Sequence, residues 1–400
     1  MRDIRTQVAI VGAGPAGLLL SHLLSCAGID SIVVDHRWYD DIASTIRAGI
    51  LEAGSVRLLV DSGVSDRVLT AGDRHNGVVL RFDGANHRID FQESVGESVW
   101  LYPQTEVFLD LSRRRSADGG DVRYGVTGTA VDISGDRPTV AFTESCGGPV
   151  RVEADLLVGA DGSRSICRHA YPPGVRKVWL REYPFAWFGV LTEAPPSNDE
   201  LIYAHSEFGF ALISRRTEAL QRMYFQCPLG TRPEEWDDDR IWSQLRRRVD
   251  GNGFALREGP IVAKTVLPFR SFVTAPMRHG NLLLAGDAAH TVPPTGAKGL
   301  NLALADVAVL AEEIAEFYAR RDPDVLDRYT ERALDRVWRA QHFSYWATTM
   351  LHSIDGASPF DIERQRGELA LITGSRYGAA YFADAYTGWQ HRKPTERRKE

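Results

Sequence analysis

The stretch TQVAIVGAGPAGLLLSHLLSCAGIDSIVVD, residues 6–35, decides the fold that we predict for this chain. It reads as an apolar strand, a glycine-rich turn, an apolar helix and a second strand, which together form a βαβ unit. Gly12 permits the tight turn, Gly14 lets the backbone approach a pyrophosphate, and Gly17 allows close packing of helix on strand. Asp35, at the end of the second strand, can accept hydrogen bonds from the ribose hydroxyls of an adenosine. The pattern indicates a dinucleotide-binding domain, and a glycine-rich turn without a ligand is the weaker alternative.

A second segment, LLLAGDAAHTVPPTGAKGLN at residues 282–301, indicates that the ligand is long. A buried strand delivers the carboxylate of Asp287 to its end, and the following loop cannot be helical at Pro293 and Pro294. The loop then directs backbone N–H groups into a helix that starts at Gly299, where an anion or an electron-rich ring can be held. The first fingerprint alone does not separate NAD from FAD. This distant segment favours FAD, because an extended FAD has a ribityl chain and a ring to be held elsewhere.

Composition and charge argue against several classes of protein. The 400 residues are 44% apolar and 25% charged with a net charge of −6, as expected for an ordinary soluble globular protein of two or three domains. This balance gives no reason to expect nucleic acid as a partner, and no apolar run approaches the length of a membrane span. The four cysteines lack metal-ligand spacing, so we expect free thiols and no metal. The N-terminus enters a strand without a leader pattern, which predicts a cytoplasmic protein.

Changes of pattern along the chain predict its domain organisation. Short alternating runs, interrupted by one helix pattern near residues 234–249, favour an antiparallel sheet inserted into the first domain. The chain then returns to the parallel sheet and continues as helical patterns. We predict an α/β fold whose parts are a discontinuous Rossmann-like FAD-binding domain of the glutathione-reductase type at residues 1–183 and 269–320, a substrate-binding β-sheet domain at 184–268, a C-terminal helical region at 321–390 and a mobile basic tail at 391–400.

A polar pattern in the inserted sheet predicts a binding site for a carboxylate. Ser214 and Arg216 are two residues apart, so they share one face of a strand, and Arg222 and Tyr224 do the same on the next strand. A loop of five residues, 217–221, is expected between them. If the strands pair, one face carries guanidinium and hydroxyl groups among apolar side chains, which suits an aromatic carboxylate because arginine offers a bidentate fork. A polar hairpin with a surface arginine is the alternative.

Three motifs together resemble those of the single-component flavoprotein aromatic hydroxylases: GAGPAG, Asp161-Gly162 in DLLVGADGSRSICR, and Gly286-Asp287. The segments IRAGILE, YPQTE, YPFAWFG and AGDAAHTVPPTGAKGLNLA are similar to the narrower p-hydroxybenzoate hydroxylase family, and the resemblance extends over residues 6–390. It implies an FAD-dependent monooxygenase that uses NADPH or NADH and O2. The implied reaction is hydroxylation of a 4-hydroxybenzoate-type acid, most simply of 4-hydroxybenzoate to 3,4-dihydroxybenzoate.

Two alternatives stay open beside that reaction. The first is hydroxylation of a substituted 4-hydroxybenzoate, such as the 3-amino compound, in secondary metabolism, with Ile50 and Ile213 as positions that can alter the pocket. The second, from another class, is a flavoprotein that binds an aromatic acid without oxygenating it, as a reductase or a sensor. The family also implies a possible homodimer.

The resemblance implies roles for individual residues. The substrate carboxylate is implied to bind Ser214, Arg216 and Tyr224. The substrate phenol is implied to meet a proton relay made of Tyr203, Tyr386 and His75, beside the backbone carbonyl of Pro294. Together, the two fingerprints and the resemblance assign cofactor contacts to Gly12, Gly14, Ala16, Gly17, Asp35, Arg47, Gln104, Asp161, Gly286, Asp287, Gly299, Leu300 and Asn301.

The sequence departs from the family where the nicotinamide coenzyme is expected to bind. The stretch after Asp35 reads HRWYDDIAST, with adjacent acids at Asp40 and Asp41. A 2′-phosphate meets few cations there, although Arg37 and Arg164 can supply positive charge. NADH use, or use of both coenzymes, is therefore as plausible as NADPH use.

Overall fold

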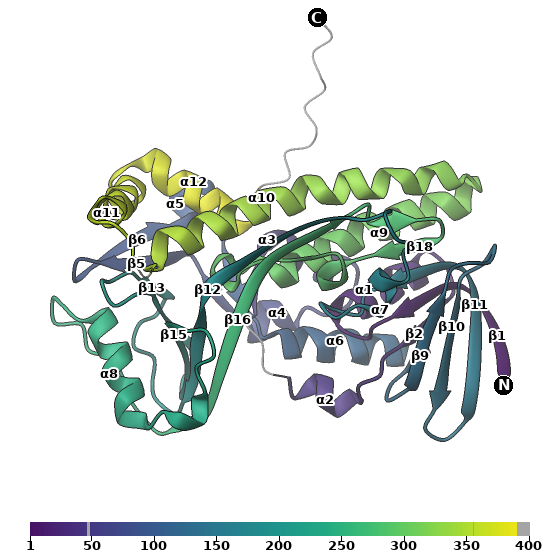
Figure 1. The fold of residues 1–400 in the computed structure, drawn as a ribbon, viewed down its shortest axis with the longest axis horizontal. Coiled ribbons are helices and arrows are strands. Elements are labelled where there is room, and N and C mark those ends of the chain that lie inside the picture. Colours follow the sequence, from purple (N-terminus) through teal and green to yellow (C-terminus); the bar gives the residue numbers. More distant parts are fainter. Residues whose placement is uncertain (46–48, 355, 390–400) are drawn as a thin grey trace, which may run out of the picture.

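The computed structural model describes residues 1–45, 49–354 and 356–389, and within these ranges the strands form three sheets (Figure 1). The first sheet has the order β17-β18-β11-β1-β2-β8, and β10 and β9 extend it from β11. Its strands are β1 (Arg2–Val11), β2 (Ser31–Val34), β8 (Asp121–Arg123), β9 (Thr127–Asp132), β10 (Thr139–Glu144), β11 (Gly148–Gly159), β17 (Arg278–His279) and β18 (Leu282–Leu284).

The predicted βαβ unit is confirmed. β1 pairs in parallel with β2 and with β11, and β11 pairs in parallel with β18, so the two sequence motifs end at the same edge of one sheet. Val8, Ile10 and Leu18 are fully buried between the sheet and its helices, and burial of such a side chain contributes about 1.5–3 kcal/mol. The covering helices are α1 (Pro15–Cys26), α6 (Gln104–Ala117) and α9 (Gly299–Arg320).

The second sheet has the order β19-β16-β12-β15-β14-β13-β5-β6. Most of its neighbouring strands are antiparallel, as predicted, but β13 pairs in parallel with β5. Its strands are β5 (Gly77–Phe82), β6 (Ala85–Asp90), β12 (Lys177–Thr192), β13 (Ile202–Ala204), β14 (Ala211–Thr217), β15 (Leu220–Pro228), β16 (Ile261–Ala275) and β19 (His290–Thr291).

The predicted limits of this sheet, residues 184–268, are too narrow. The strands β12 and β16 run beyond both limits as a long antiparallel pair that reaches from the first sheet to the second (Figure 1). Residues 177–182 of β12 are exposed and lack a buried face, so no alternating pattern marks them as a strand. The strands β5 and β6 join from the N-terminal third of the chain, a pairing that local patterns cannot predict.

The remaining elements surround these sheets. A small third sheet has the order β3-β7-β4, and α10 crosses above the first two sheets to reach α11 and α12 (Figure 1). The strands are β3 (Ile50–Glu52), β4 (Asp73–His75) and β7 (Val99–Leu101), and the helices are α2 (Tyr39–Ala43), α3 (Ala53–Asp61), α4 (Arg67–Ala71), α5 (Phe91–Val95), α7 (Ile166–His169), α8 (Asp238–Val249), α10 (Arg328–Leu351), α11 (Pro359–Gly374) and α12 (Arg376–Thr387). In the described part of the chain, no helix is both long and apolar enough to cross a membrane. The predicted mobile tail, 391–400, lies outside the described residues.

Candidate active site

The glycine-rich turn has the geometry of a dinucleotide cradle. A Cβ built on Gly12 would lie 2.2 Å from the carbonyl oxygen of Ala160, and one on Gly17 would lie 1.9 Å from that of Gly12. These two glycines are therefore required by packing. A Cβ built on Gly14 meets nothing within 4 Å, so the backbone at Gly14 faces open space, where the fingerprint places a pyrophosphate.

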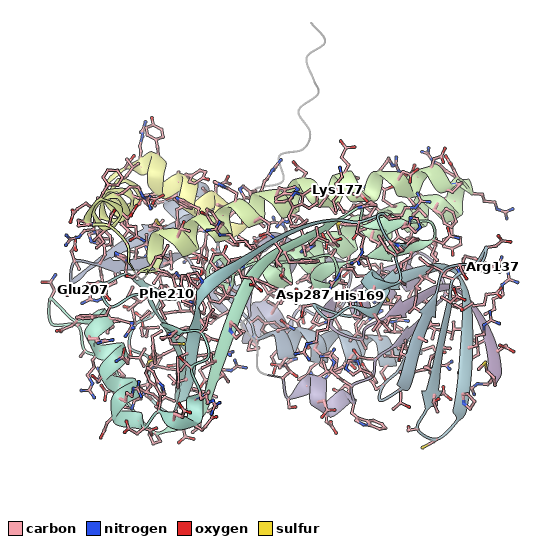
Figure 2. The ribbon with its side chains drawn as sticks, viewed as in Figure 1. Arg137, His169, Lys177, Glu207, Phe210 and Asp287 are labelled. Atoms are coloured by element: carbon pink, nitrogen blue, oxygen red, sulfur yellow. The ribbon has the colours of Figure 1, made fainter. Side chains whose placement is uncertain are left out.

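The two sequence motifs come together in space. A Cβ built on Gly286 would lie 3.8 Å from the side chain of Ala16 and 3.0 Å from that of Ala303. Asp287 follows at the end of β18, near the middle of the molecule in Figure 2 and between the labelled Phe210 and Arg137. Across the same edge, Asp161 follows β11. One of its oxygens accepts from the backbone N–H of Cys167 at 3.1 Å, and the other is buried without a partner among the described residues.

These observations fit a long dinucleotide cofactor. The first turn of α9, from Gly299 through Leu300 to Asn301, has no side-chain cap, so its backbone N–H groups are open to a ligand. Gln104 stands at the start of α6 and is half-buried. Arg47 was also assigned to the cofactor, but it lies outside the described residues. An open backbone at one motif and uncapped amides beside the other are what an extended FAD requires.

Asp35 forms several hydrogen bonds within the protein. Its Oδ2 accepts from the backbone N–H of Ala13 at 2.8 Å and from Nη2 of Arg37 at 2.9 Å, and its Oδ1 accepts from the backbone N–H of Arg37. The sequence suggested Arg37 as a cation for a coenzyme phosphate. The guanidinium instead pairs with Asp35, so its positive charge is offset.

The side chain of Asn301 does not face a ligand. Its Oδ1 accepts from the backbone N–H of Glu52 at 2.9 Å and from Oγ of Ser55 at 2.7 Å, and its Nδ2 donates to the carbonyl oxygens of Ile50 and Ala297. The predicted cofactor contact of Asn301 can therefore involve only its backbone. The side chain fixes β3 and the start of α3 against α9.

A buried ionic cluster beside Tyr386 was missed at the sequence level. Lys298 is 1% exposed, and its Nζ donates to Oε1 of Glu52 at 2.6 Å and to the carbonyl oxygen of Tyr386 at 2.8 Å. Arg336 donates to the other oxygen of Glu52. The only available signal was a lysine between two glycines in GAKGLN, which resembles a solvated turn. Its partners come from segments more than 30 residues away in either direction, so the cluster could not be predicted from the sequence.

His290 pairs with Asp306 beneath the loop of the second motif. Its Nε2 lies 2.6 Å from Oδ2 of Asp306, which also accepts from the backbone N–H of Gly286 at 2.9 Å. Burial disfavours the imidazolium, but the carboxylate of Asp306 outweighs burial and raises the pKa of His290. This pair holds the motif loop on α9.

The pair predicts a pH dependence of stability. The pKa of His290 is raised in the folded state above its ordinary value of 6.5, so the stabilisation is complete below about pH 6.5 and is lost as the pH rises through the folded-state pKa. A tenfold difference in proton affinity corresponds to about 1.4 kcal/mol. We expect the Tm difference between wild type and His290→Gln to be largest near pH 6 and to shrink toward about pH 9, as measured by differential scanning fluorimetry. His342→Gln, at an exposed histidine, serves as the control, and a pH-independent difference for His290→Gln contradicts the prediction.

The predicted hairpin forms, although with a tighter turn. The strands β14 and β15 pair with Leu212 opposite Tyr224 and Ser214 opposite Arg222, and only residues 218–219 separate them. The expected five-residue loop is wrong, because the strands continue pairing past a bulge after Arg215. Directly opposed residues point to the same face, so the hydroxyl and guanidinium groups do share a face as predicted.

Two guanidinium groups on this face have no acidic partner. Neither Arg216 nor Arg222 forms an ion pair with a carboxylate of the described residues, and Nη1 of Arg222 is buried without a hydrogen-bond partner. Burial and the charge of Arg222 lower the pKa of Arg216. Since arginine stays protonated in proteins, the pair forms an uncompensated, half-buried positive site that suits an anion.

The predicted tyrosine pair is present at the other end of the same face. Tyr203 lies opposite Leu212 in the neighbouring strand, and its hydroxyl is 3.0 Å from that of Tyr386. Burial raises the pKa of Tyr203 to about 12 although the hydrogen bond with Tyr386 opposes the rise, and burial raises that of Tyr386 further. Both hydroxyls therefore remain protonated at neutral pH, and neither is a tyrosinate base. The pair can only pass a proton along.

The remaining assigned residues occupy the edges of this site. His75 is 3% exposed on β4, and no hydrogen bond of the described residues joins it to Tyr386. The carbonyl oxygen of Pro294 accepts from the backbone N–H of Ala297 at 2.9 Å and retains a second lone pair. The prediction that Ile213 lines the pocket was wrong, because its side chain points to the opposite face of the sheet and packs in the core under α8.

The face is lined by aromatic side chains that exclude water. Trp187 stacks on Phe210 at a centroid distance of 5.0 Å and contacts Tyr224 at 5.1 Å. Gly189, opposite Tyr224, gives that ring its space, since a Cβ there would lie 2.7 Å from it. By strand geometry, Tyr203 and Ser214 lie about 8 Å apart at their Cα atoms, which is comparable to the length of one hydroxybenzoate.

Sequence comparisons identify proteins that are similar to this chain. A family model described as FAD binding domain matches residues 5–344. A p-hydroxybenzoate hydroxylase from Acinetobacter baylyi is 44% identical over 390 residues, which cover 97% of this chain and 96% of that protein. A 3-(3-hydroxy-phenyl)propionate/3-hydroxycinnamic acid hydroxylase from Mycobacterium avium is 27% identical, with 82% of this chain and 58% of that protein covered.

Solved structures share the fold. A p-nitrophenol 4-monooxygenase from Pseudomonas putida superposes with a TM-score of 0.80 at 18% identity, covering 97% of this chain and 99% of that one. A Diels-Alderase of pyrroindomycin biosynthesis superposes with a TM-score of 0.77 at 23% identity, covering 96% and 81%. The predicted fold class is confirmed. Because one fold serves a hydroxylase and a Diels-Alderase, these structures do not decide the reaction.

Proposed function

The chain belongs to the p-hydroxybenzoate hydroxylase family of FAD-dependent aromatic hydroxylases, and from this premise we propose that it hydroxylates 4-hydroxybenzoate to 3,4-dihydroxybenzoate. The observation that carries the proposal is the composition of one sheet face. A buried hydroxyl pair stands at one end, Tyr203 with Tyr386, and two unpaired guanidinium groups stand at the other, Arg216 and Arg222. A single ring with a phenol and a para carboxylate matches both ends.

The protein residues orient the substrate and move its phenol proton. Arg216 and Arg222, with Ser214, hold the carboxylate and thereby place the phenol at Tyr203. When bound, FAD accepts a hydride from NADH or NADPH and supplies the O2 chemistry that delivers one oxygen atom to the ring. Ring attack by an electrophilic oxygen is faster on a phenolate than on a phenol.

The tyrosine pair assists that deprotonation by relay. Tyr203 accepts the phenol proton while its own proton passes to Tyr386, since the raised pKa of each hydroxyl disfavours a lasting tyrosinate. We propose His75 as the base that takes the proton from Tyr386 through a bridging water. Trp187 and Phe210 keep bulk water from the ring.

We further propose that NADH serves at least as well as NADPH. Arg37 pairs with Asp35, and Asp40 and Asp41 are exposed on α2. A 2′-phosphate therefore meets two negative charges and an already neutralised cation, whereas the ribose hydroxyls of NADH do not depend on positive charge. Comparison of kcat/KM for the two coenzymes tests this proposal.

We propose a homodimer through exposed aromatic side chains. Trp179 and Trp338 are each more than 40% exposed and lie edge to face at 5.5 Å, and Tyr345 is exposed beside them. Apolar groups gathered in this way commonly mark a protein–protein contact. Light scattering of the holoenzyme and of Trp338→Glu distinguishes a dimer held by this surface from a monomer.

The deciding experiment supplies the FAD-loaded protein with NADH or NADPH, O2 and one aromatic acid at a time. The acids are 4-hydroxybenzoate and its 3-amino derivative, with benzoate as a control that lacks the phenol. We expect 3,4-dihydroxybenzoate in close to one-to-one ratio with the coenzyme consumed. Efficient turnover of the 3-amino acid alone makes the substituted substrate the correct one. Hydrogen peroxide without an oxygenated product from either acid contradicts the proposed reaction.

Gly14→Leu is expected to lower FAD binding at least tenfold without unfolding the protein. The backbone at Gly14 has φ −73°, and a Cβ there meets nothing, so the apoprotein accepts the larger side chain. That side chain fills the space in which a pyrophosphate must approach the backbone. FAD content by absorbance and secondary structure by circular dichroism measure the two effects.

Gly367→Leu is the matched control, because a Cβ at this exposed helical glycine of α11 also meets nothing. It is expected to retain wild-type FAD content. An equal FAD content in Gly14→Leu would place the pyrophosphate elsewhere.

A further inference from the structure

Asp73 links buried His75 to the protein surface. The two residues are two apart on β4, and Oδ2 of Asp73 lies 2.8 Å from Nε2 of His75. The same oxygen accepts from Nε of Arg215 at 2.8 Å. The side chain of His75 is 3% exposed and that of Asp73 is 35% exposed. Of the two, only the carboxylate has access to bulk water.

The hydrogen bonds determine the tautomer of His75. An ionised carboxylate is only an acceptor, so the proton of neutral His75 resides on Nε2. Nδ1 then carries a lone pair, and it is buried without a partner among the described residues. The neighbouring Asn76 accepts at its carbonyl from the backbone N–H of Phe91, whose ring stacks on Tyr386 at 5.2 Å. His75 is thus the chain neighbour of a residue that contacts the segment packed on Tyr386.

We propose that Asp73 is a positioning residue for His75 and the outlet through which the phenol proton reaches solvent. This inference rests on the relay proposed above and extends it by one residue. One proton enters His75 at Nδ1, one leaves Nε2 for Oδ2 of Asp73, and the carboxyl group releases it to water. No electron is transferred. The same steps in reverse restore the starting tautomer when the product is protonated.

Arg215 holds this outlet in place. It stands between Ser214 and Arg216 on β14, and its guanidinium bridges Asp73 and Glu218, with Nη2 2.9 Å from Oε1 of Glu218. Its contact with Asp73 ties β4 to the strand that carries the substrate-binding residues. His75 and Arg215 are the charged or titratable groups that contact Asp73 among the described residues.

The test measures proton release on substrate binding. The oxidised, FAD-loaded enzyme is mixed with 4-hydroxybenzoate in weak buffer with a pH-indicator dye, and release is followed by stopped flow. We expect Asp73→Asn to slow the release about tenfold, because an amide still accepts hydrogen bonds from His75 and Arg215 but cannot carry a proton. KM is expected to change little. Asp73→Glu, or added formate at high concentration, is expected to restore much of the rate.

Glu218→Gln is the matched control. The substitution removes the same charge from the other carboxylate that contacts Arg215. Glu218 is 81% exposed and does not contact His75. We expect wild-type release from this variant. A normal rate in Asp73→Asn, with slow release in His75→Gln and Tyr203→Phe, overturns the role of Asp73 and leaves the relay intact. A normal rate in all three variants contradicts the relay itself.

Discussion

Replacing Arg216 with glutamine is expected to raise the KM for 4-hydroxybenzoate about 100- to 1000-fold. Arg216 and Arg222 form a half-buried positive site without an acidic partner, and the substrate carboxylate supplies the missing charge. Removing one partner of a hydrogen-bonded, partly buried charge pair costs about 2–5 kcal/mol, or roughly 30-fold to several thousandfold in affinity, and the expected change lies within these limits. Glutamine is shorter and neutral, remains polar, and loses the bidentate fork. Steady-state kinetics and substrate titration of the flavin absorbance measure the effect.

The size of the effect depends on geometry as well as charge. Arg216→Lys is expected to recover only part of the affinity, because an ammonium presents a point charge and not a planar fork. Arg232→Gln serves as a control, since Arg232 is 71% exposed and forms a surface ion pair with Glu235. A KM for Arg216→Gln within about threefold of wild type, with Arg232→Gln also unchanged, would place the carboxylate elsewhere.

Sequence reasoning succeeded where function imposes local geometry. Gly12 and Gly17 are recognisable because close backbone packing leaves no room for a Cβ, and Gly14 because a pyrophosphate must approach its backbone; these constraints act over a few residues. The shared face of Ser214 and Arg222 was predictable for a similar reason, because side chains alternate along two nearby strands, but their direct pairing was not. The connection of Tyr203 with Tyr386 came only from the family resemblance, since these residues are 183 positions apart.

The errors have physical causes too. Ile213 was predicted as a pocket residue, but it alternates with Leu212 and Ser214 along β14 and therefore points to the opposite face of the sheet. The hydrogen bonds of the Asn301 side chain were not predicted, because its partners at Ile50 and Glu52 belong to a distant segment of the chain. The exposed start of β12 carries no apolar alternation, because it pairs with β16 without covering a core.

The charged side chains at the two ends of the site differ in whether they have partners of opposite charge. At the carboxylate end, Arg216 and Arg222 are left uncompensated, so a substrate anion is stabilised there. Near Tyr386, the positive charge of Lys298 is compensated by Glu52, which also pairs with Arg336. Burial lowers the pKa of Lys298 although Glu52 opposes this effect. The carboxylate end therefore presents two cations without a carboxylate partner among the described residues, whereas the two cations near Tyr386 share the carboxylate of Glu52.

This difference leads to the expected behaviour of Tyr203→Phe, in which substrate binding and hydroxylation separate. The KM is expected to stay within about threefold of wild type, because the arginines supply most of the binding energy. The rate of hydroxylation is expected to fall about 10- to 100-fold, since a positioned proton acceptor contributes on the order of 100-fold or more and the phenol loses its first acceptor. Coenzyme consumption then yields mainly hydrogen peroxide. Product analysis by liquid chromatography, against coenzyme consumed, measures this uncoupling.

Tyr183→Phe is the matched control for the loss of a buried hydroxyl. Tyr183 is 4% exposed on β12 of the same sheet, and its hydroxyl lies 3.1 Å from Oγ of Ser271. Its removal costs a comparable hydrogen bond without touching the relay, so coupling is expected to stay at the wild-type level. If Tyr183→Phe and Tyr203→Phe uncouple equally, the defect comes from loosened packing of the sheet. If Tyr203→Phe remains fully coupled, the phenol proton leaves by another path, and His75 loses its proposed role with it.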